Sequence, residues 1–246
     1  MAVRSILDQS VKDLELIIIE EPSTTRGEDF LRDLPDPRVR HYYHPTRTTL
    51  VEQRNRGIEL ARSELIAVLD ADDIAEPDRL AKQLEFMEAH PEVGALGTQL
   101  RLIDPKGNTI GFRRYPTSPK DVTAALEIIN PIGQPSVMYR KSVVQKAGMY
   151  RYPVIEDYEL WCRLAANGVL LANLDEPLVR YRIHGGGIKA TQLRGTLKST
   201  IELKEQYYGS TMSAKAKLRL LGERALLKLP PQLVLWLFVR TTTSGK

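Results

Sequence analysis

The chain has 246 residues, of which 42% are hydrophobic and 27% are charged, and its formal net charge is +4. These values are typical of globular proteins and exclude a disordered or fibrous chain. The single cysteine, Cys162, cannot form an intrachain disulfide, so we expect the reducing environment of the cytoplasm.

The first half of the sequence alternates short β-type runs with helical patterns, as in βα units on a mainly parallel sheet. We expect strands at 14–19, 38–43 and 64–69, and helices at 48–61 and 77–90. The strand at 64–69, Glu-Leu-Ile-Ala-Val-Leu, is predicted to be buried on both faces. It ends directly before a cluster of aspartates.

In the second half the strands and helices follow a looser order. A hairpin is predicted around the turn Asp104-Pro105-Lys106-Gly107-Asn108, followed by a strand, a helix and two closing strands. These elements are expected at 94–103 with 109–113, at 136–140, at 158–167, and at 169–174 with 178–183. The whole pattern predicts an α/β domain with a helical tail.

The linker-like run Gly185-Gly186-Gly187 divides an expected domain at 1–191 from a cationic helical tail at 192–246. The tail has a cationic amphipathic pattern, and its apolar run at 233–239 is shorter than the ~18 residues that cross a membrane. Two roles stay open for it: contact with the inner face of the plasma membrane, or packing on the main domain or a second subunit. The pattern consists of Lys215, Lys217, Arg219, Arg224 and Lys228 with Leu218, Leu220, Leu221, Leu226 and Leu227.

Three carboxylates, Asp70, Asp72 and Asp73, stand at the carboxyl end of a strand, where open α/β sheets place their ligands. Their mutual repulsion calls for a cation, and oxygen ligands suit Mg²⁺ or Mn²⁺ shared with phosphate. An EF-hand loop is set aside because Ala75 stands where that loop requires glycine. Capping of the helix near Pro77 accounts for at most one of the three carboxylates.

Five motifs follow one another in a characteristic order: Gln53-Arg54-Asn55-Arg56-Gly57-Ile58, Leu69-Asp70-Ala71-Asp72-Asp73, Gln134-Pro135-Ser136-Val137-Met138-Tyr139-Arg140, Ile155-Glu156-Asp157-Tyr158-Glu159-Leu160-Trp161 and Arg180-Tyr181-Arg182-Ile183-His184. With them the chain resembles the family-2 glycosyltransferases, which are inverting enzymes. The resemblance implies a GT-A fold, a Rossmann-like mixed sheet flanked by helices. It also implies sugar transfer from a nucleotide diphosphate, with UDP favoured, to a hydroxyl of a glycan or lipid-linked acceptor.

The resemblance assigns the nucleotide and metal roles to particular residues. Asp72 lies closest to Mn²⁺ or Mg²⁺, and Asp70 lies nearer the ribose and uracil. Arg54 corresponds to a basic residue that touches the nucleotide; alternatively, it is an ordinary exposed helix charge. Glu21 can still reach the base, and His184 resembles a histidine that helps to hold the metal or diphosphate, although a lone histidine is more often structural. Asn55 and Gly57 are expected to let their helix pack under the site.

Glu156 and Asp157 form a second acidic site before an amphipathic helix. Inverting transfer needs a base that removes the proton of the acceptor hydroxyl, and the resemblance assigns this role to Asp157. Glu156 orients the acceptor or exchanges roles with Asp157. The alternative is that one of them simply caps the helix.

The sequence departs from the family at its start, where no strand precedes the helix expected at Val3 to Gln9. The acidic turn of the family appears here as Glu20-Glu21-Pro22-Ser23. Without that central strand we expect two sheet edges that are exposed, paired with each other, or paired with another chain. This motivates the alternative of a catalytically inactive binding or scaffold protein.

A nucleotidyltransferase ranks third among the functions, because it explains the strand-end carboxylates but not Glu156, Asp157 and Trp161. No nucleic acid partner is expected, since the basic residues lack aromatic interleaving and belong to no recognised module.

Overall fold

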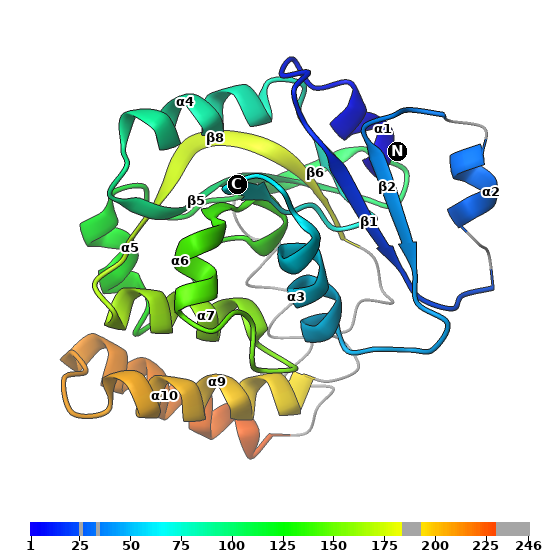
Figure 1. The fold of residues 1–246 in the computed structure, drawn as a ribbon. Coiled ribbons are helices and arrows are strands. Elements are labelled where there is room, and N and C mark those ends of the chain that lie inside the picture. Colours follow the sequence, from blue (N-terminus) through cyan, green and yellow to red (C-terminus); the bar gives the residue numbers. More distant parts are fainter. Residues whose placement is uncertain (25–26, 33–34, 184–192, 230–246) are drawn as a thin grey trace.

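The computed structural model describes residues 1–24, 27–32, 35–183 and 193–229, and these residues form a mixed α/β fold (Figure 1). The strands are β1 (Leu16–Glu20), β2 (Val39–Tyr43), β3 (Leu65–Ala67), β4 (Ile74–Ala75), β5 (Val93–Ile103), β6 (Thr109–Arg113), β7 (Met138–Arg140) and β8 (Leu170–Arg182).

The helices are α1 (Ala2–Leu7), α2 (Gly27–Arg32), α3 (Leu50–Leu60), α4 (Arg79–Ala89), α5 (Pro119–Ala125), α6 (Lys141–Lys146), α7 (Glu156–Ala166), α9 (Leu193–Tyr208) and α10 (Ala214–Leu227), with a 3₁₀ turn, η1, at Gln134–Ser136. The short elements α2, β4, α5 and α6 were not predicted. Each is seven residues or shorter and gives little periodicity to read.

The strands form two sheets. β1 and β2 pair in parallel, while a six-stranded sheet has the order β3-β7-β5-β8-β4 with β6 added beside β5. In the larger sheet β5 and β8 run in parallel, and the other pairings are antiparallel. The predicted mixed sheet is confirmed. The parallel order expected for the first half of the chain holds for β1 and β2 but not for β3, which pairs antiparallel with β7.

The hairpin of β5 and β6 is confirmed. The carboxylate of Asp104 accepts hydrogen bonds from the N–H groups of Lys106 and Asn108, and Gly107 takes a φ of +93° that favours glycine. The two closing strands expected at 169–174 and 178–183 are instead one strand, β8. Its register against β5 shifts between Thr98 and Leu100, so the chain passes Pro177 by a bulge rather than a turn.

β1 and β3 are the neighbouring edges of the two sheets, and they do not pair with each other in the described chain. β1 has four consecutive aliphatic residues but is only half-buried, and Ala67 in β3 is exposed. The prediction that 64–69 is buried on both faces was therefore wrong, because β3 lies at the edge of its sheet. Three outcomes were expected for the two sheet edges: exposure, pairing with each other, or pairing with another chain. The described chain does not show the second of these, because β1 and β3 do not pair.

The main core lies between the larger sheet and α7. Leu160, Trp161 and Leu164 of α7 are fully buried and pack with Ile58 of α3 and Tyr139 of β7. Cys162 is buried in the same cluster, and burial raises the pKa of its thiol to about 12. This core fixes the first turn of α7 relative to α3, and both helices bear predicted site residues.

The described part of the tail, α9 and α10, forms a layer below α7 (Figure 1). The ammonium of Lys204 donates to the carbonyl of Ile128 (2.6 Å) and to the carboxylate of Glu223 in α10 (2.8 Å). Tyr207 donates to Glu159 of α7 (2.9 Å). The helix α9 therefore packs on the main domain, which is one of the two roles left open for the tail. The apolar run at 233–239 lies outside the described residues.

Candidate functional site

The three carboxylates that follow β3 point to different partners. Asp73 is 1% exposed, and its Oδ1 accepts a hydrogen bond from the N–H of Arg182 in β8 (2.8 Å). Burial, reinforced by the charges of Asp70 and Asp72, raises the pKa of Asp73 to about 7. Asp72 is exposed and Asp70 is half-buried. Asp73 therefore differs from the other two carboxylates, because it is buried and ties this turn to β8.

Helix capping does not explain the acidic turn. The residue that precedes α4 is Asp78, and no side chain caps that helix. The turn is closed instead by the N–H of Asp73, which donates to the carbonyl of Asp70 (3.1 Å). The guanidinium of Arg182 also donates to the carbonyl of Asp72 (2.9 Å). Asp72 thus remains at the surface, on a turn that is fixed from both sides.

A buried cation lies behind this turn. Arg79 is fully buried and donates to the carbonyl of Val68 (2.8 Å) and to the side chain of Gln83 (2.9 Å). Burial lowers the pKa of Arg79 to about 9, against the opposing effect of Asp73 and Asp70. Its charge partly offsets that of the acidic turn. Sequence reasoning missed Arg79, since an arginine in the first turn of a helix resembles a surface residue.

Arg54 of α3 joins the two predicted acidic sites. Its Nη2 lies 3.5 Å from Oδ1 of Asp70 and 3.4 Å from Oε1 of Glu156, and its guanidinium lies over the ring of Tyr150, 5.7 Å from the ring centre. The side chain is 10% exposed, and its buried Nε has no hydrogen-bond partner among the described residues. This placement excludes the alternative of an ordinary exposed helix charge.

Asn55, the next residue, connects α3 with the segment that enters α7. Its side chain accepts from the N–H of Tyr150 (2.9 Å) and donates to the carbonyl of the same residue (3.0 Å). The hydroxyl of Tyr150 in turn accepts from Gln134 (2.7 Å). A methyl group at Gly57 would meet no described atom within 4 Å, so close packing does not require glycine there.

Glu156 and Asp157 occupy the first turn of α7, where the helix dipole favours negative charge. Glu156 is 7% exposed, and burial followed by the charge of Asp157 raises its pKa. Ile155 is the N-cap residue and makes no side-chain cap, so neither carboxylate caps the helix in the usual way. Asp157 does accept from the N–H of Tyr158 through Oδ1 (2.8 Å).

The second carboxylate oxygen of Asp157 accepts from the amide of Asn130 (2.7 Å). Sequence reasoning missed Asn130, which lies 27 residues earlier in the chain. The dipeptide Asn130-Pro131 signals a turn, but nothing in the sequence shows where its amide points. Two donors thus hold Asp157 in one orientation and leave lone pairs on both oxygens for a further donor.

Glu21 is not joined to Arg54 in the same way. Oε2 of Glu21 accepts from the N–H of Thr48 (3.2 Å), two residues before α3, and no ion pair joins Glu21 to Arg54 in the described chain. His184 lies outside the described residues. The structure therefore brings Asp70 and Glu156 to the guanidinium of Arg54, with Asp157 next to Glu156 in α7 and Asp72 at the surface beside Asp70.

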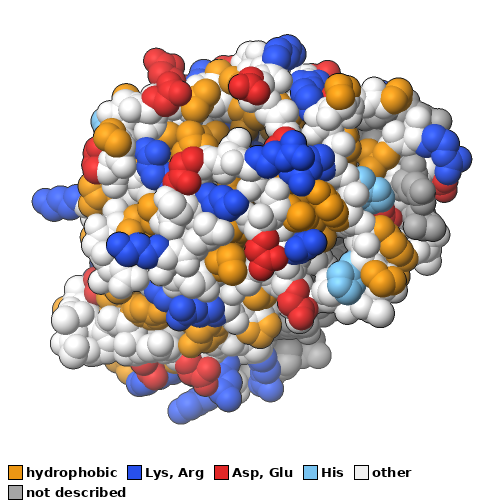
Figure 2. Space-filling view, in the orientation of Figure 1, with side chains coloured by type: hydrophobic (Ala, Val, Ile, Leu, Met, Phe, Trp, Pro, Cys, Tyr) orange, Lys and Arg blue, Asp and Glu red, His pale blue; other side chains and the backbone are white. Residues whose placement is uncertain are grey.

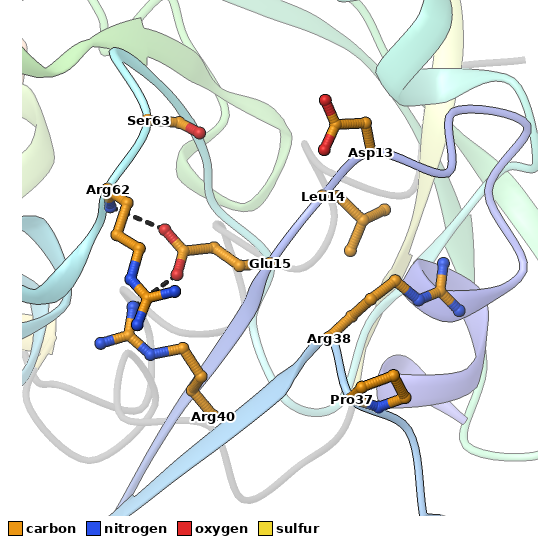
Figure 3. A pocket seen from close by; sticks show the side chains of 8 residues that line it. All are labelled: Asp13, Leu14, Glu15, Pro37, Arg38, Arg40, Arg62 and Ser63. Carbon is orange, nitrogen blue, oxygen red and sulfur yellow. Dashed lines mark hydrogen bonds and ion pairs between the residues drawn. The ribbon is translucent and has the colours of Figure 1, made fainter.

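A cavity of about 370 Å³ lies elsewhere, at the amino ends of β1, β2 and β3 (Figure 3). Glu15 crosses it, accepting from the N–H of Arg62 (2.6 Å) and pairing with Arg40. Its other lining residues are Asp13, Leu14, Pro37, Arg38 and Ser63. Ligands of α/β sheets bind at the carboxyl ends of the strands, so this cavity is not the site predicted around Asp70.

The donor set of the acidic turn fits a cation that is shared with a phosphate ligand rather than one enclosed by protein. In residues 1–24, 27–32, 35–183 and 193–229 no group of three or more His, Cys, Asp or Glu side chains could hold a metal. Mg²⁺ is often bound by one or two carboxylates plus phosphate oxygens and water. An exposed Asp72 beside a half-buried Asp70 meets that description.

The model of the family described as "Glycosyl transferase family 2" matches residues 1–147. The chain is 33% identical over 150 residues to the amylovoran biosynthesis glycosyltransferase AmsE of Erwinia amylovora, which covers 61% of the chain and 56% of AmsE. The chain thus spans little more than half the length of that relative.

Two solved structures share the fold. S. aureus TarS 1-349 in complex with UDP has a TM-score of 0.63 at 13% identity, over 89% of this chain and 64% of that one. The mannosyltransferase PcManGT from Pyrobaculum calidifontis, in complex with GDP-Man and Mn²⁺, has a TM-score of 0.60 at 16% identity, over 97% and 74%. The fold is therefore the GT-A fold, and the chain belongs to glycosyl transferase family 2.

Proposed function

We propose that this protein is an inverting glycosyltransferase that moves a sugar from a nucleoside diphosphate to a hydroxyl of a glycan or lipid-linked acceptor, with UDP as the favoured nucleotide. The observation that carries the proposal is the position of Arg54, whose guanidinium contacts Asp70 (3.5 Å) and Glu156 (3.4 Å). A donor-side carboxylate and the carboxylates of α7 thereby form one centre. The UDP and GDP-Man complexes of TarS and PcManGT support a nucleotide donor.

In the proposed reaction Asp157 accepts the proton of the acceptor hydroxyl. The hydroxyl oxygen bonds to the anomeric carbon on the side opposite the nucleotide, and the bond from that carbon to the diphosphate oxygen breaks. Its electron pair stays on the diphosphate. The amide of Asn130 and the N–H of Tyr158 orient Asp157 for this proton transfer.

The negative charge that develops on the leaving diphosphate requires compensation. When bound at Asp72, Mn²⁺ or Mg²⁺ would supply positive charge beside the diphosphate oxygens. Arg54 contributes from the protein side, because its Nη2 is already directed to Asp70 and its buried Nε has no hydrogen-bond partner in the part of the chain that the structure describes. Glu21 and His184 complete the proposed nucleotide and metal contacts.

The proposed domain boundary, with a catalytic domain at 1–191 and the tail at 192–246, follows the glycines at 185–187. A cytoplasmic location agrees with the lone buried Cys162. Among the described residues, no helix is both long and apolar enough to cross a membrane.

Calorimetry tests the proposed donor. We expect the purified chain to bind UDP in the presence of Mn²⁺ and to bind it at least about tenfold more weakly after chelation of the metal. GDP serves as the competing nucleotide, and tighter binding of GDP would change the favoured donor without changing the class. No binding of either nucleotide with Mn²⁺ present would remove the proposal.

The second candidate is a nucleotide-binding member of the family without catalytic activity. The specific observation in its favour is the break between the two sheets, where β1 and β3 do not pair with each other in the described chain. Hydrolysis of UDP-sugars decides between the two. Slow hydrolysis by the parent that disappears in Asp157→Asn supports the enzyme, whereas nucleotide binding without turnover on any acceptor supports the second candidate.

A further inference from the structure

The outer face of helix α10 carries exposed leucines, which α9 does not. Its inner face is buried on α9 through Ala216, Leu220 and Glu223. On the opposite face Leu218 is 72% exposed and Leu221 is 59% exposed. These two leucines are the only large hydrophobic residues in 193–229 that are fully at the surface. The amphipathic pattern seen in the sequence is therefore only partly used for packing.

The spacing of the exposed residues makes a continuous apolar strip. Positions three, four and seven apart share one face of a helix, so Leu218, Leu221 and Ala225 align with Ala214 and Gly222 beside them. At 100° per residue, Lys215 and Arg219 fall on one side of this strip, while Lys217 and Arg224 fall on the other. We call this surface the α10 face. Aliphatic stems on both sides would extend its apolar area while their charges remain in water.

The described part of the tail is strongly cationic. Residues 193–229 contain eight Lys and Arg against three Glu, a net charge of +5, while the whole chain carries +4. The only acid in α10 is Glu223, which is buried and paired with Lys204 (2.8 Å) and with Arg219 (3.1 Å). Arg224 pairs with Glu205 of α9. In Figure 2, Lys and Arg side chains protrude from the lower rim of the molecule, with Asp and Glu side chains beside them, over the layer formed by α9 and α10 in Figure 1.

We propose that the α10 face binds the surface of an anionic lipid bilayer, with Leu218 and Leu221 inserted between the lipids and the flanking Lys and Arg on their headgroups. Apolar residues flanked by cations that outnumber the acids beside them are complementary to such a surface. A second copy of the chain fits poorly, because it would bring together two tails that each carry a net charge of +5 over residues 193–229. A nucleic acid backbone would leave both leucines without an apolar partner. The proposal does not depend on sugar transfer.

The test uses the full chain and vesicles of phosphatidylcholine and phosphatidylglycerol in equal parts, with pure phosphatidylcholine as the neutral comparison. We expect the parent chain to sediment with the anionic vesicles and, at low protein concentration, to remain free of the neutral ones. The double substitutions Leu218→Ser with Leu221→Ser, and Lys215→Glu with Lys217→Glu, should each weaken binding by about tenfold or more. Raised salt should weaken it further.

A matched control lies on the hairpin of β5 and β6. Ile110 is 52% exposed and Lys106 is exposed, so Ile110→Ser with Lys106→Glu removes similar chemistry from another surface. We expect this control to bind vesicles like the parent. Melting temperatures equal to that of the parent would show that the α10 variants fold, as expected for exposed positions.

Residues 230–246 are present in every variant, so a difference between variants reports on α10 itself. Parent chain that fails to bind the anionic vesicles would overturn the proposal, and so would α10 variants that bind as tightly as the parent. Sedimentation velocity without lipid provides the remaining comparison. A dimer of the parent that dissociates in the leucine variant would assign the α10 face to a second copy instead.

Discussion

Two acidic sites contact the same arginine, and they differ in what holds their carboxylates. At the end of β3, Asp72 is exposed and Asp70 is half-buried. At the start of α7, Glu156 is 7% exposed and Asp157 accepts two hydrogen bonds from the protein. The first site is open to a ligand that brings its own charges, whereas the second is oriented before any ligand binds. This difference suits a donor site with a diphosphate and a base that must keep one geometry.

The largest effect is expected at the base. Asp157→Asn keeps the shape and the acceptor for the amide of Asn130 but removes the proton acceptor, so turnover of UDP-sugar should fall by about 10²- to 10⁴-fold. UDP binding measured by calorimetry should stay within about twofold, because Asp157 does not hold the donor in this account. Asp175→Asn, at a side chain 85% exposed, is the matched control. Equal loss of binding and turnover would place Asp157 on the donor side.

The second-largest effect is expected at Arg54, which contacts both acidic sites. Arg54→Met should lower the free energy of unfolding by about 1–3 kcal/mol, because it leaves the buried Glu156 without its cation. It should also weaken UDP binding. The control is Arg56→Met on the same helix, where the side chain is 56% exposed and a change of about 0.5 kcal/mol or less is expected. Urea unfolding measures both, and equal losses would contradict the buried role of Arg54.

A smaller effect on UDP binding is expected to distinguish Asp72 from Asp73. Asp72→Asn should weaken Mn²⁺-dependent UDP binding by about tenfold, since a neutral amide is a poorer ligand for a hard cation. Asp73→Asn should leave that binding nearly unchanged, because Asp73 is buried and its Oδ1 accepts from Arg182, which an amide oxygen can also do. Calorimetry with and without Mn²⁺ compares the two. The reverse order would show that Asp73 is the ligand.

The smallest expected effect is a pH dependence of stability at Glu156. Burial raises the pKa of this carboxyl, so the folded chain binds its proton more tightly than the unfolded chain does. The associated stability is present at low pH and is lost as pH rises through the folded pKa. Compared with Glu156→Gln, the parent should therefore lose melting temperature between pH 5 and pH 8. A difference that stays constant over this range would show that Glu156 ionises normally.

The sequence predicts the parts of this site that depend on local pattern. The turn at 104–108 and the acidic residues after β3 were correctly located, since strand ends and turn residues leave short-range signals. Glu156 and Asp157 were expected before a helix at 158–167, whereas α7 begins at Glu156 and includes both. The direction of each side chain was not predictable. Asp73 turns to β8, and Asn130 reaches Asp157 across 27 residues, contacts that only the packed chain defines. Burial of Arg54 likewise depends on Tyr150, far along the sequence.

We propose that Arg54 couples the two acidic sites into one centre, and a double-mutant cycle measures that coupling. UDP affinity with Mn²⁺ is measured for Asp70→Asn, Glu156→Gln and their combination, first with Arg54 present and then in the Arg54→Met background. We expect a coupling energy of about 0.5 kcal/mol or more with Arg54 that disappears without it. Additive effects in both backgrounds would contradict the claim and leave two independent acidic sites.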